Sequence, residues 1–270
     1  MLRMRVRLRP DLSVLSVRGD DARTWLNGQV TNDIRSTKSG DAVHALVLNV
    51  KGRILADAIV VDRGERGLAA VIPASEHASL REHLEKYVIM EDVELVLDET
   101  LSVAVVYGED AAIGGERFAT PWLGADASIW LGDARALAAL PQLDEAEAER
   151  DRIREGRAAF GTDFGPTTYP QEAGLDAAVS FQKGCYLGQE VVCMLENRGQ
   201  LSRKLVRIET DRAVSPGAKV LDESGTDVGA ITSATTTSEG RGIALGYVKR
   251  TALDGTRALH VDGAPARLTR

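Results

Sequence analysis

The periodicity of the sequence changes near residue 200, and this change limits the folds open to the chain. After residue 201 no helical repeat is present. Instead, short segments rich in β-branched residues recur between Gly-containing turns, at residues 204–210, 219–222, 228–236, 243–249 and 259–261. Short strands at such spacing are typical of a small barrel or sandwich. The sequence therefore predicts an all-β domain that begins between residues 197 and 203.

The first two thirds of the chain mix both kinds of secondary structure. Segments rich in Leu and Val, or alternating between acidic and apolar residues, predict strands at 12–17, 44–50, 53–62, 91–97, 102–107 and 128–131. Helices are predicted at 20–29, 75–87, 133–140 and 144–157. Asp20 is the expected N-cap of the first helix. We expect an α+β region over residues 1–200, followed by a second domain over residues 201–270.

The composition is that of a globular protein with an acidic balance. The 270 residues include 33 Lys and Arg against 40 Asp and Glu, a net charge of −7, which argues against phosphate-driven binding to nucleic acid. No apolar segment is long enough to span a bilayer, and the basic start is not followed by the apolar stretch of a secretory signal. Two cysteines are too few for a disulfide framework. We expect a cytoplasmic protein without membrane or nucleic-acid partners.

Several common catalytic and metal-binding motifs are absent from the sequence. It contains no P-loop, no GxGxxG, no HExxH and no GxSxG. His77 and His83 do not have the spacing of a helical ligand pair, and no histidine is near either cysteine. We therefore predict no bound metal.

The segment 181–190, with the sequence FQKGCYLGQE, carries the strongest chemical signal. Lys183 precedes Cys185 by two residues, and glycines flank the Cys-Tyr pair. A helix beginning near Cys185, together with the Lys183 charge, would lower the pKa of the thiol below its usual value of about 8.5. The alternative is that Cys185 is a small buried hydrophobic residue, as most free cysteines are. Burial is the favoured interpretation for Cys193, which lies in an apolar run.

This segment also resembles a known family. Residues 183–190, KGCYLGQE, match the K-G-C-Y-x-G-Q-E signature of the YgfZ family of folate-binding proteins, which are linked to iron–sulfur cluster maintenance and related to the glycine-cleavage T-protein aminomethyltransferase. Further similar stretches are WLNGQVTNDI at 25–34, NVKGRILAD at 49–57, RIREGR at 152–157, YPQEAGLD at 169–176 and ALGYV at 244–248. The resemblance implies a T-protein-like folate-binding α+β body with ferredoxin-like layers, followed by a small C-terminal β-barrel.

The resemblance implies tetrahydrofolate, or a derivative, as the cofactor. Glu155 matches the glutamate of the R-x-E-x-G stretch that binds the pterin in the T-protein. One carboxylate can accept hydrogen bonds from both the 2-amino group and the ring N–H of a pterin. Without the resemblance, Glu155 would be taken for a solvated charge on a helix. Lys183 and Tyr186 of the signature are further expected folate-binding residues.

Asp57 is the second catalytic candidate beside Cys185. It lies at the acidic end of a stretch in which the T-protein has two acids, where this chain has Ala56 and Asp57. If the catalytic acid is the first of the two, it is missing here, and aminomethyl transfer is in doubt while folate binding remains. An unpaired carboxylate within an apolar strand is costly to bury, which favours a functional role for Asp57 over a structural one.

A basic patch lies at the expected domain boundary. Arg198, Arg203, Lys204 and Arg207 occur without an acid between residues 197 and 208. These bases offer a site for the glutamate carboxylates of a folate tail. The alternative is a solvated strand edge whose charges prevent aggregation.

These features lead to three hypotheses for the function. The first is a tetrahydrofolate-binding protein that supports the assembly or repair of iron–sulfur enzymes through Cys185, with folate and iron–sulfur client or assembly proteins as partners. The second is a folate-dependent aminomethyltransferase or other one-carbon transferase. The third is a scaffold that binds clients through the barrel. The Cys185 signature, which the T-protein lacks, favours the first hypothesis, and whether the chain catalyses a reaction stays open.

Overall fold

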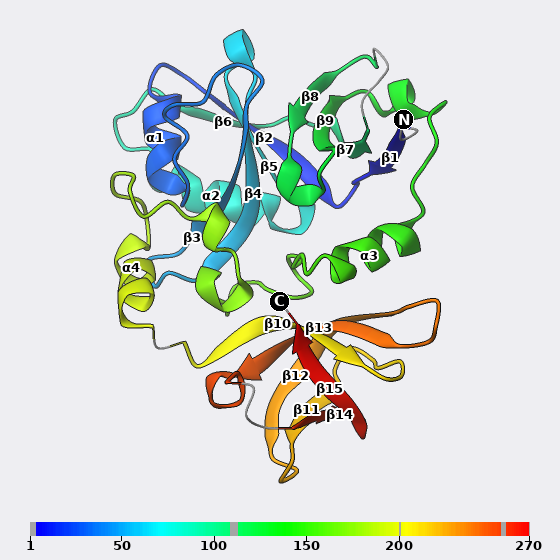
Figure 1. Ribbon diagram of the computed structural model, residues 1–270. Coiled ribbons are helices and arrows are strands. Elements are labelled where there is room, and N and C mark those ends of the chain that lie inside the picture. The colour runs from blue at the N-terminus through cyan, green and yellow to red at the C-terminus, as the bar shows by residue number, and fades with distance from the viewer. Residues whose placement is uncertain (1–3, 109–112, 200, 255–257, 270) are drawn as a thin grey trace. The chain divides into compact units, whose positions relative to one another are not determined.

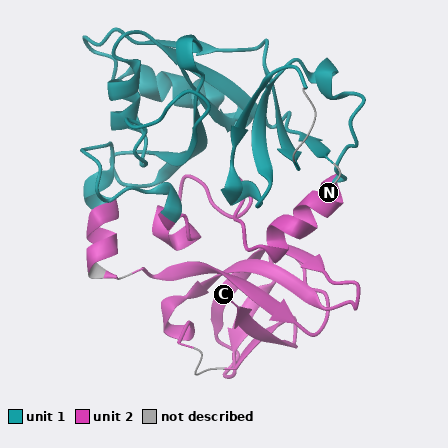
Figure 2. Cartoon of the chain, turned by 45° about the horizontal axis from the view of Figure 1, so that its top comes forward, with its two compact units in different colours: residues 1–144, 177–191 teal, residues 145–176, 192–270 magenta. Residues whose placement is uncertain are grey.

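The computed structural model describes residues 4–108, 113–199, 201–254 and 258–269, without the side chain of Arg198. Contacts divide the chain into two compact units (Figure 2). Unit 1 contains residues 1–144 and 177–191, and unit 2 contains residues 145–176 and 192–270. The expected division into residues 1–200 and 201–270 stays a prediction, and by contacts residues 145–176 group with the barrel.

Unit 1 is built on two antiparallel sheets with the strand orders β3-β4-β5-β2-β6 and β1-β7-β9-β8 (Figure 1). The first sheet consists of β2 (Leu12–Arg18), β3 (Ala42–Leu48), β4 (Ile54–Asp62), β5 (Leu68–Pro73) and β6 (Glu94–Leu97). The second consists of β1 (Arg5–Leu8), β7 (Ser102–Tyr107), β8 (Glu116–Ala119) and β9 (Ala127–Gly132).

Apart from Asp57 and Asp62, strand β4 is apolar because both of its faces are covered. Successive residues of a strand point to opposite faces. Ile59 and Val61 pack in the core between the two sheets. Ala58 and Val60 join the other core, which contains residues of helices α1 (Ala22–Gln29) and α2 (His77–Glu85). A strand covered on both sides has an apolar run rather than an alternating pattern.

Two of the helix predictions are wrong in detail. The N-cap of α1 is Asp21, not Asp20, and its side chain does not cap the helix, since the Asp21 carboxylate accepts a hydrogen bond from the Asp92 N–H at 2.9 Å. The helix expected at 133–140 is only a 3₁₀ turn, η4 (Ala134–Leu137). The segment ends at Pro141 after too few residues to sustain an α-helix.

Unit 2 contains a closed antiparallel barrel with the strand order β10-β13-β12-β11-β14-β15 (Figure 1). Its strands are β10 (Arg203–Thr210), β11 (Lys219–Asp222), β12 (Asp227–Thr236), β13 (Gly242–Lys249), β14 (Leu259–Val261) and β15 (Ala264–Thr269). Inside it, Ile208, Val220 and Val248 belong to one buried cluster. Helix α3 (Glu145–Arg154) packs on the barrel through Ile153, which contacts a cluster containing Leu245. The predicted barrel is thus confirmed.

Helix α4 (Gln189–Arg198) begins four residues after Cys185, so the prediction of a helix starting near Cys185 is wrong. Gly188 is the reason. Its φ is +82°, a left-handed conformation outside the helical region, and a Cβ there would lie 2.5 Å from the carbonyl oxygen of Asn49. Single-turn 3₁₀ helices complete the described chain at η1 (Gly64–Arg66), η2 (Ala74–Glu76), η3 (Pro121–Leu123), η5 (Pro170–Ala173), η6 (Asp176–Ala178) and η7 (Arg250–Ala252).

No helix within the described residues has the length and apolar character needed to cross a bilayer. The expected cytoplasmic location stays a prediction.

Candidate functional site

A cleft of about 580 Å³ in unit 2 brings together three residues that the sequence singles out. Glu155 lies on one part of its wall, and Lys204 and Arg207 of β10 lie on another. The remaining lining is largely apolar or backbone: Gly156, Ala173, Gly174, Leu205, Val206, Leu245, Leu253, Asp254, Leu268 and Thr269. An acid, two bases and apolar walls therefore share one concave surface.

Glu155 is presented by the turn that ends α3. Its N–H still bonds the Asp151 carbonyl at 3.0 Å, and Gly156 then leaves the helix with a φ of +72°. The Glu155 side chain is 52% exposed, and its Oε2 accepts a hydrogen bond from Arg157 Nε at 2.9 Å. A negative charge at a helix C-terminus opposes the helix dipole. Glu155 is therefore not placed there by helix stability, which favours a binding role.

A buried ion network holds the Glu155 turn to the barrel. Arg152 Nη1 donates to Asp163 Oδ2 at 2.6 Å and to the Arg157 carbonyl at 2.5 Å. Its Nη2 donates to Ser233 Oγ of β12 at 2.7 Å and to Glu149 Oε1 at 2.6 Å. Burial alone would lower the pKa of Arg152, but Glu149 and Asp163 outweigh burial and raise that pKa. The guanidinium therefore stays charged and links α3, the Glu155 turn and the barrel.

Two bases of the predicted patch reach the cleft. Lys204 is exposed, whereas Arg207 is partly buried and donates from Nη2 to Glu209 Oε1 at 2.6 Å. The Nε of Arg207 is buried and has no hydrogen-bond partner among the described residues. These two side chains are the ones placed to meet an anionic ligand in the cleft.

Arg203, by contrast, is not among the described residues that line the cleft. The guanidinium of Arg203 lies 4.4 Å from the ring centre of Tyr247, and its Nε lies 3.5 Å from Glu172 Oε1. Arg203 is thus engaged in a cation–π contact and an ion pair. Arg198 is the last residue of α4, and its side chain lies outside the described residues.

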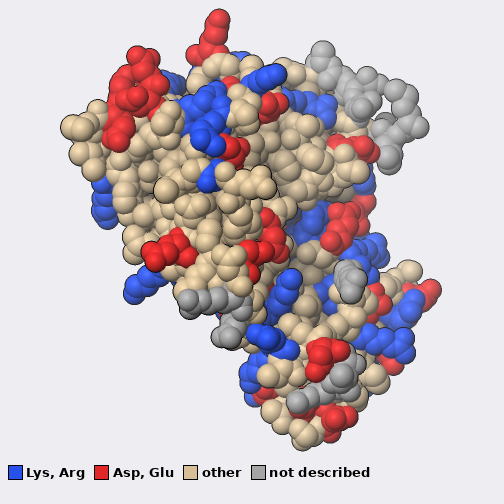
Figure 3. All heavy atoms as spheres, turned by 60° about the vertical axis from the view of Figure 1, so that its left-hand side comes forward, with Lys and Arg blue, Asp and Glu red and all other residues tan. Residues whose placement is uncertain are grey.

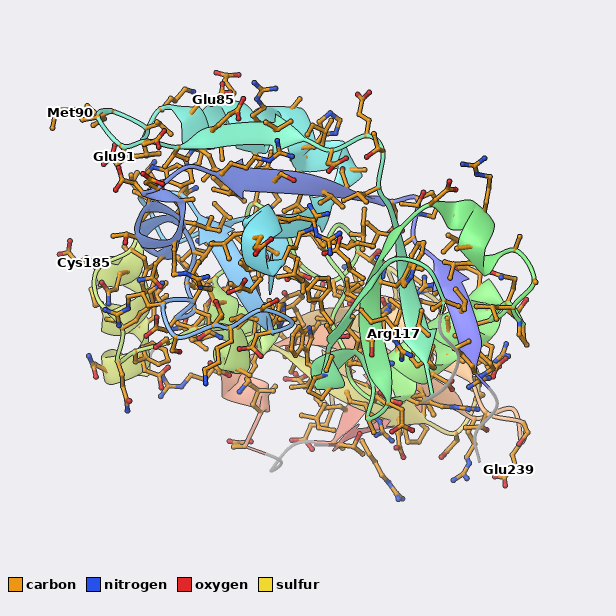
Figure 4. The ribbon with its side chains drawn as sticks, turned by 90° about the horizontal axis from the view of Figure 1, so that it is seen from above. Glu85, Met90, Glu91, Arg117, Cys185 and Glu239 are labelled. Carbon is orange, nitrogen blue, oxygen red and sulfur yellow. The ribbon has the colours of Figure 1, made fainter. Side chains whose placement is uncertain are left out.

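The KGCYLGQE segment lies in unit 1, and it exposes its thiol. Cys185 is exposed and lies at the edge of the molecule in Figure 4, which excludes its interpretation as a buried hydrophobic residue. Its neighbours face inward: Tyr186 is 7% exposed and Lys183 is 6% exposed. Lys183 Nζ lies 5.4 Å from the Tyr186 ring centre. Cys193, on α4, has intermediate exposure.

Asp57 has a partner that the sequence did not reveal. His44 Nε2 lies 2.6 Å from Asp57 Oδ1, and the imidazole stacks on Trp122 with ring centres 5.6 Å apart. Burial alone would lower the pKa of His44, but the charge and hydrogen bond of Asp57 outweigh it and raise that pKa. The expectation of an unpaired Asp57 carboxylate is therefore wrong. Because side chains alternate along β3 and β4, both residues lie on the same face, but finding the pair requires the register of the two strands.

A second cleft, of about 660 Å³, lies in unit 1 beside η1 and the start of α1. Four arginines line it, but its buried charges are already matched. Arg63 pairs with Glu116 at 2.7 Å, and Arg23 pairs with Asp62 at 2.6 Å. Although this cleft is larger, its pairs use the groups that a ligand would need, so the cleft of unit 2 is the better candidate. No group of three or more metal-ligating side chains occurs within the described residues.

Comparisons with known proteins agree with this architecture. Residues 11–112 match the family model of the GCVT N-terminal domain, and residues 203–270 match the CAF17 C-terminal beta-barrel domain. The chain is 28% identical to the mitochondrial iron-sulfur cluster assembly factor IBA57 homolog of Pyricularia oryzae, over 72% of this chain and 54% of that protein. It is 27% identical to the tRNA-modifying protein YgfZ of Yersinia enterocolitica, over 85% of this chain and 80% of that protein. The chain thus spans about half of the first relative.

A solved structure shares the fold. The glycine cleavage system aminomethyltransferase T of Bartonella henselae matches with a TM-score of 0.84 and 19% identity, over 99% of this chain and 85% of that one. The fold is therefore that of a T-type aminomethyltransferase with a C-terminal barrel, as the sequence predicted. The two domain matches and the relatives fit the YgfZ/IBA57 family, which is related to the aminomethyltransferases.

Proposed function

We propose that the chain binds a tetrahydrofolate-type cofactor in the cleft of unit 2 and supports the assembly or repair of iron–sulfur proteins, with Cys185 as its reactive group. The observation that carries the folate part is the meeting of Glu155, Lys204 and Arg207 in one cleft. Glu155 is expected to bind the pterin, and Lys204 and Arg207 are expected to bind the tail of the same ligand.

The donor and acceptor groups of the cleft fit a folate. Its volume lies within the range of small-molecule sites, roughly 300–1,000 Å³. The Glu155 carboxylate can accept the paired N–H donors of a pterin, and Lys204 and Arg207 can bind glutamate carboxylates. Bound folate would supply one-carbon or redox chemistry. Glu155 would orient the pterin ring at the acidic end of the cleft, and Lys204 and Arg207 would hold the tail at the basic end of the cleft.

The iron–sulfur part rests on the names of the relatives and on the exposed thiol. Relatives in the same family carry the name of iron–sulfur cluster assembly factors. A thiol that a partner can reach suits contact with a cluster or with a client protein, and Cys185 is such a group. Acidic and basic side chains lie interspersed on the face shown in Figure 3, and the net charge is −7. We therefore propose protein partners rather than RNA.

The folate proposal is tested by calorimetric titration with tetrahydrofolate. Glu155→Ala should weaken binding by about 10- to 150-fold, because the loss of hydrogen bonds to a charged group costs about 1.5–3 kcal/mol. Glu147→Gln, on α3 but outside the cleft, is the matched control and should bind as the parent does. An affinity that changes less than twofold in folded Glu155→Ala would contradict the proposal.

The tail assignment is tested with two ligands that differ only in their glutamates. Lys204→Glu should weaken a polyglutamylated folate more than the monoglutamate, because only the longer tail adds carboxylates. Lys219→Glu, an exposed barrel lysine outside the cleft, should affect neither ligand. Equal losses for both ligands would show that Lys204 does not contact the tail.

The role of Cys185 is tested in cells that depend on this protein for an iron–sulfur enzyme. Cys185→Ala should lose that enzyme activity while folding normally, and Cys193→Ala should behave as the parent. Full function of a folded Cys185→Ala protein would leave the KGCYLGQE motif with a packing role only.

Aminomethyl transfer is the second candidate function, because the fold matches an aminomethyltransferase. The chemistry of Asp57 speaks against it. Its carboxylate is bonded to His44, and its neighbour Ala56 is fully buried. An assay of aminomethyl transfer to tetrahydrofolate, with Asp57→Asn as the inactive control, decides between the two candidates.

A further inference from the structure

Lys183 of the KGCYLGQE segment is buried, at 6% exposure, and within the described part of the chain its ammonium donates hydrogen bonds to backbone carbonyls alone. Nζ donates to the carbonyl oxygens of Asn27 at 2.6 Å, Val30 at 2.8 Å and Asn32 at 2.7 Å. An ammonium has three donors, so these bonds use all of them. The acceptors belong to the last turn of α1 and the residues just after it, where carbonyls lack helical partners and favour a cation.

The backbone on both sides of Lys183 is bonded to the same stretch of chain. Ser180 N–H donates to the Thr31 carbonyl at 3.0 Å, and Leu187 N–H donates to the Gly28 carbonyl at 3.2 Å. The thiol-bearing turn is thus fastened before and after Cys185. The two flanking contacts are single backbone hydrogen bonds, whereas Lys183 adds three short hydrogen bonds from its side chain.

The turn between these fastenings is open. A Cβ added at Gly184 would have no heavy atom of the described residues within 4 Å, and Cys185 itself is exposed. Tyr186 and Lys183, on either side, face inward. No packing around the thiol therefore sets its direction, and the position of the sulfur depends on the inward bonds of its neighbours.

We propose that Lys183 is the positioning residue of Cys185: its ammonium ties the thiol-bearing turn to the end of α1 and holds the sulfur outward. This role differs from the expected action of Lys183 on the thiolate or on folate, because its three donors are used by carbonyls. The biological meaning of this role rests on the proposed function of Cys185. The experiment, however, reads the thiol directly and needs neither folate nor an iron–sulfur partner.

The experiment measures alkylation of Cys185 in a Cys193→Ala background, with iodoacetamide and with a bulky maleimide. In Lys183→Ala, the rate with the bulky reagent should fall at least threefold relative to the small one, because the sulfur is no longer held outward. Propylammonium has the three carbons and the charged nitrogen that Lys183→Ala lacks, and it should restore the ratio. Equal concentrations of 1-propanol or sodium chloride should not. Lys86→Ala removes an exposed lysine of the same unit and should change nothing.

Hydrogen exchange followed by mass spectrometry gives the second reading. Peptides covering residues 27–32 and 180–188 should exchange at least tenfold faster in the Lys183 variant, while peptides of the barrel should not change. If Lys183→Ala does not fold, Lys183→Met keeps most of the apolar stem and removes the ammonium, and the same peptides and rates are measured.

Three results would overturn the proposal. One is an unchanged rate ratio and exchange in a folded variant. Another is an alkylation rate of Cys185 whose pH profile is shifted in Lys183→Ala but reaches the same plateau as in the parent. That result would show that the Lys183 charge acts on the ionisation of the thiol and not on its position. The third is a failure of propylammonium to restore the ratio. If the labelling behaves as expected but Cys185→Ala supports iron–sulfur enzymes normally, the positioning role stands and the proposed function fails.

Discussion

Each unit buries one cation of a sequence motif, and the two cations are satisfied in different ways. In unit 1, Lys183 is 6% exposed and donates to three backbone carbonyls. In unit 2, Arg152 is 7% exposed and donates to the carboxylates of Asp163 and Glu149. Both cations fasten a turn that carries a candidate functional side chain, Cys185 in one unit and Glu155 in the other.

The difference lies in what happens to the charge. Burial lowers the pKa of Lys183 to about 8, with Asp33 offsetting part of the effect through space. The carboxylates around Arg152 instead raise its pKa, despite its burial. Carbonyl dipoles orient an ammonium without neutralising it, so the proton can leave near physiological pH. A carboxylate pair holds the charge, and the loss of one partner then leaves the other charge buried and unpaired.

The largest effect is expected from breaking the carboxylate pair. Asp163→Ala leaves the Arg152 guanidinium buried without its closest fully buried partner, and removal of one member of a buried pair costs about 3–5 kcal/mol. Urea-induced unfolding, followed at the transition of unit 2, should show this loss in the free energy of unfolding.

Glu149→Ala is the matched control because it removes a partner of the same guanidinium. The Glu149 side chain is 44% exposed, and exposed pairs contribute at most about 1 kcal/mol. Similar losses for both variants would mean that burial of the carboxylate does not decide the strength of this network.

A smaller effect, which depends on pH, is expected for Lys183. The unfolded chain holds the proton up to a pKa of 10.5, whereas the folded chain releases it at a pKa of about 8. Between these values the unfolded state binds more protons, so the free energy of unfolding rises with pH. The gap corresponds to roughly 3 kcal/mol, gained between pH 8 and pH 10.5.

Lys183→Met has no proton to release at this site. The difference in unfolding free energy between the parent and Lys183→Met should therefore grow in favour of the parent as the pH rises from 8 to 10.5. Unfolding curves at four or five pH values measure that difference. A flat difference would show that Lys183 keeps its proton in the folded chain and behaves as Arg152 does.

The barrel could be predicted closely because five of its six strands are signalled locally. The ranges 219–222 and 259–261 coincide with β11 and β14, and the start of β10 differs by one residue. The turn residues between strands mark the boundaries. Strand β15 (Ala264–Thr269) was missed, since its place depends on closing the barrel against β10, a pairing distant in sequence.

The α+β region was predicted less completely, because more of its strands depend on partners that are distant in sequence. Strand β7 was found at its observed bounds, but β1, β5 and β8 were missed. Strand β8 contains Glu116, whose side chain is 11% exposed because it pairs with Arg63 of a distant turn. A buried charge with a distant partner looks like a loop residue in the sequence.

The candidate site divides in a similar way. Glu155, Lys204 and Arg207 are predicted from a motif and from a charge run; they line one cleft, and their binding roles stay predictions. The partners that hold the site were not found. Arg152 lies in the recognised motif, but its partners Asp163 and Ser233 are distant in sequence and carry no motif of their own. Lys183 was assigned to the ligand because nothing local shows that three carbonyls surround it.

The smallest effect is expected for His44, a side chain of unit 1 that contacts a carboxylate. It tests whether the pH dependence of stability is set by the hydrogen-bond partner of the buried cation or by the unit in which that cation lies. The bond to Asp57 raises the pKa of His44 above its unfolded value of about 6.5. A raised pKa contributes stability that is complete below about pH 6.5 and is lost as the pH rises through the folded pKa, the opposite slope to that of Lys183. His44→Phe should therefore cost about 1–2 kcal/mol at pH 5.5, below the full value of a hydrogen bond to a charged group because the Asp57 side chain is 32% exposed, and less at pH 8. Asp57→Asn should flatten the same part of the profile, and the double variant should add nothing further. If His44→Phe costs as much at pH 8 as at pH 5.5, the stack on Trp122 holds the ring, and contact with a carboxylate is not what separates the two kinds of buried cation.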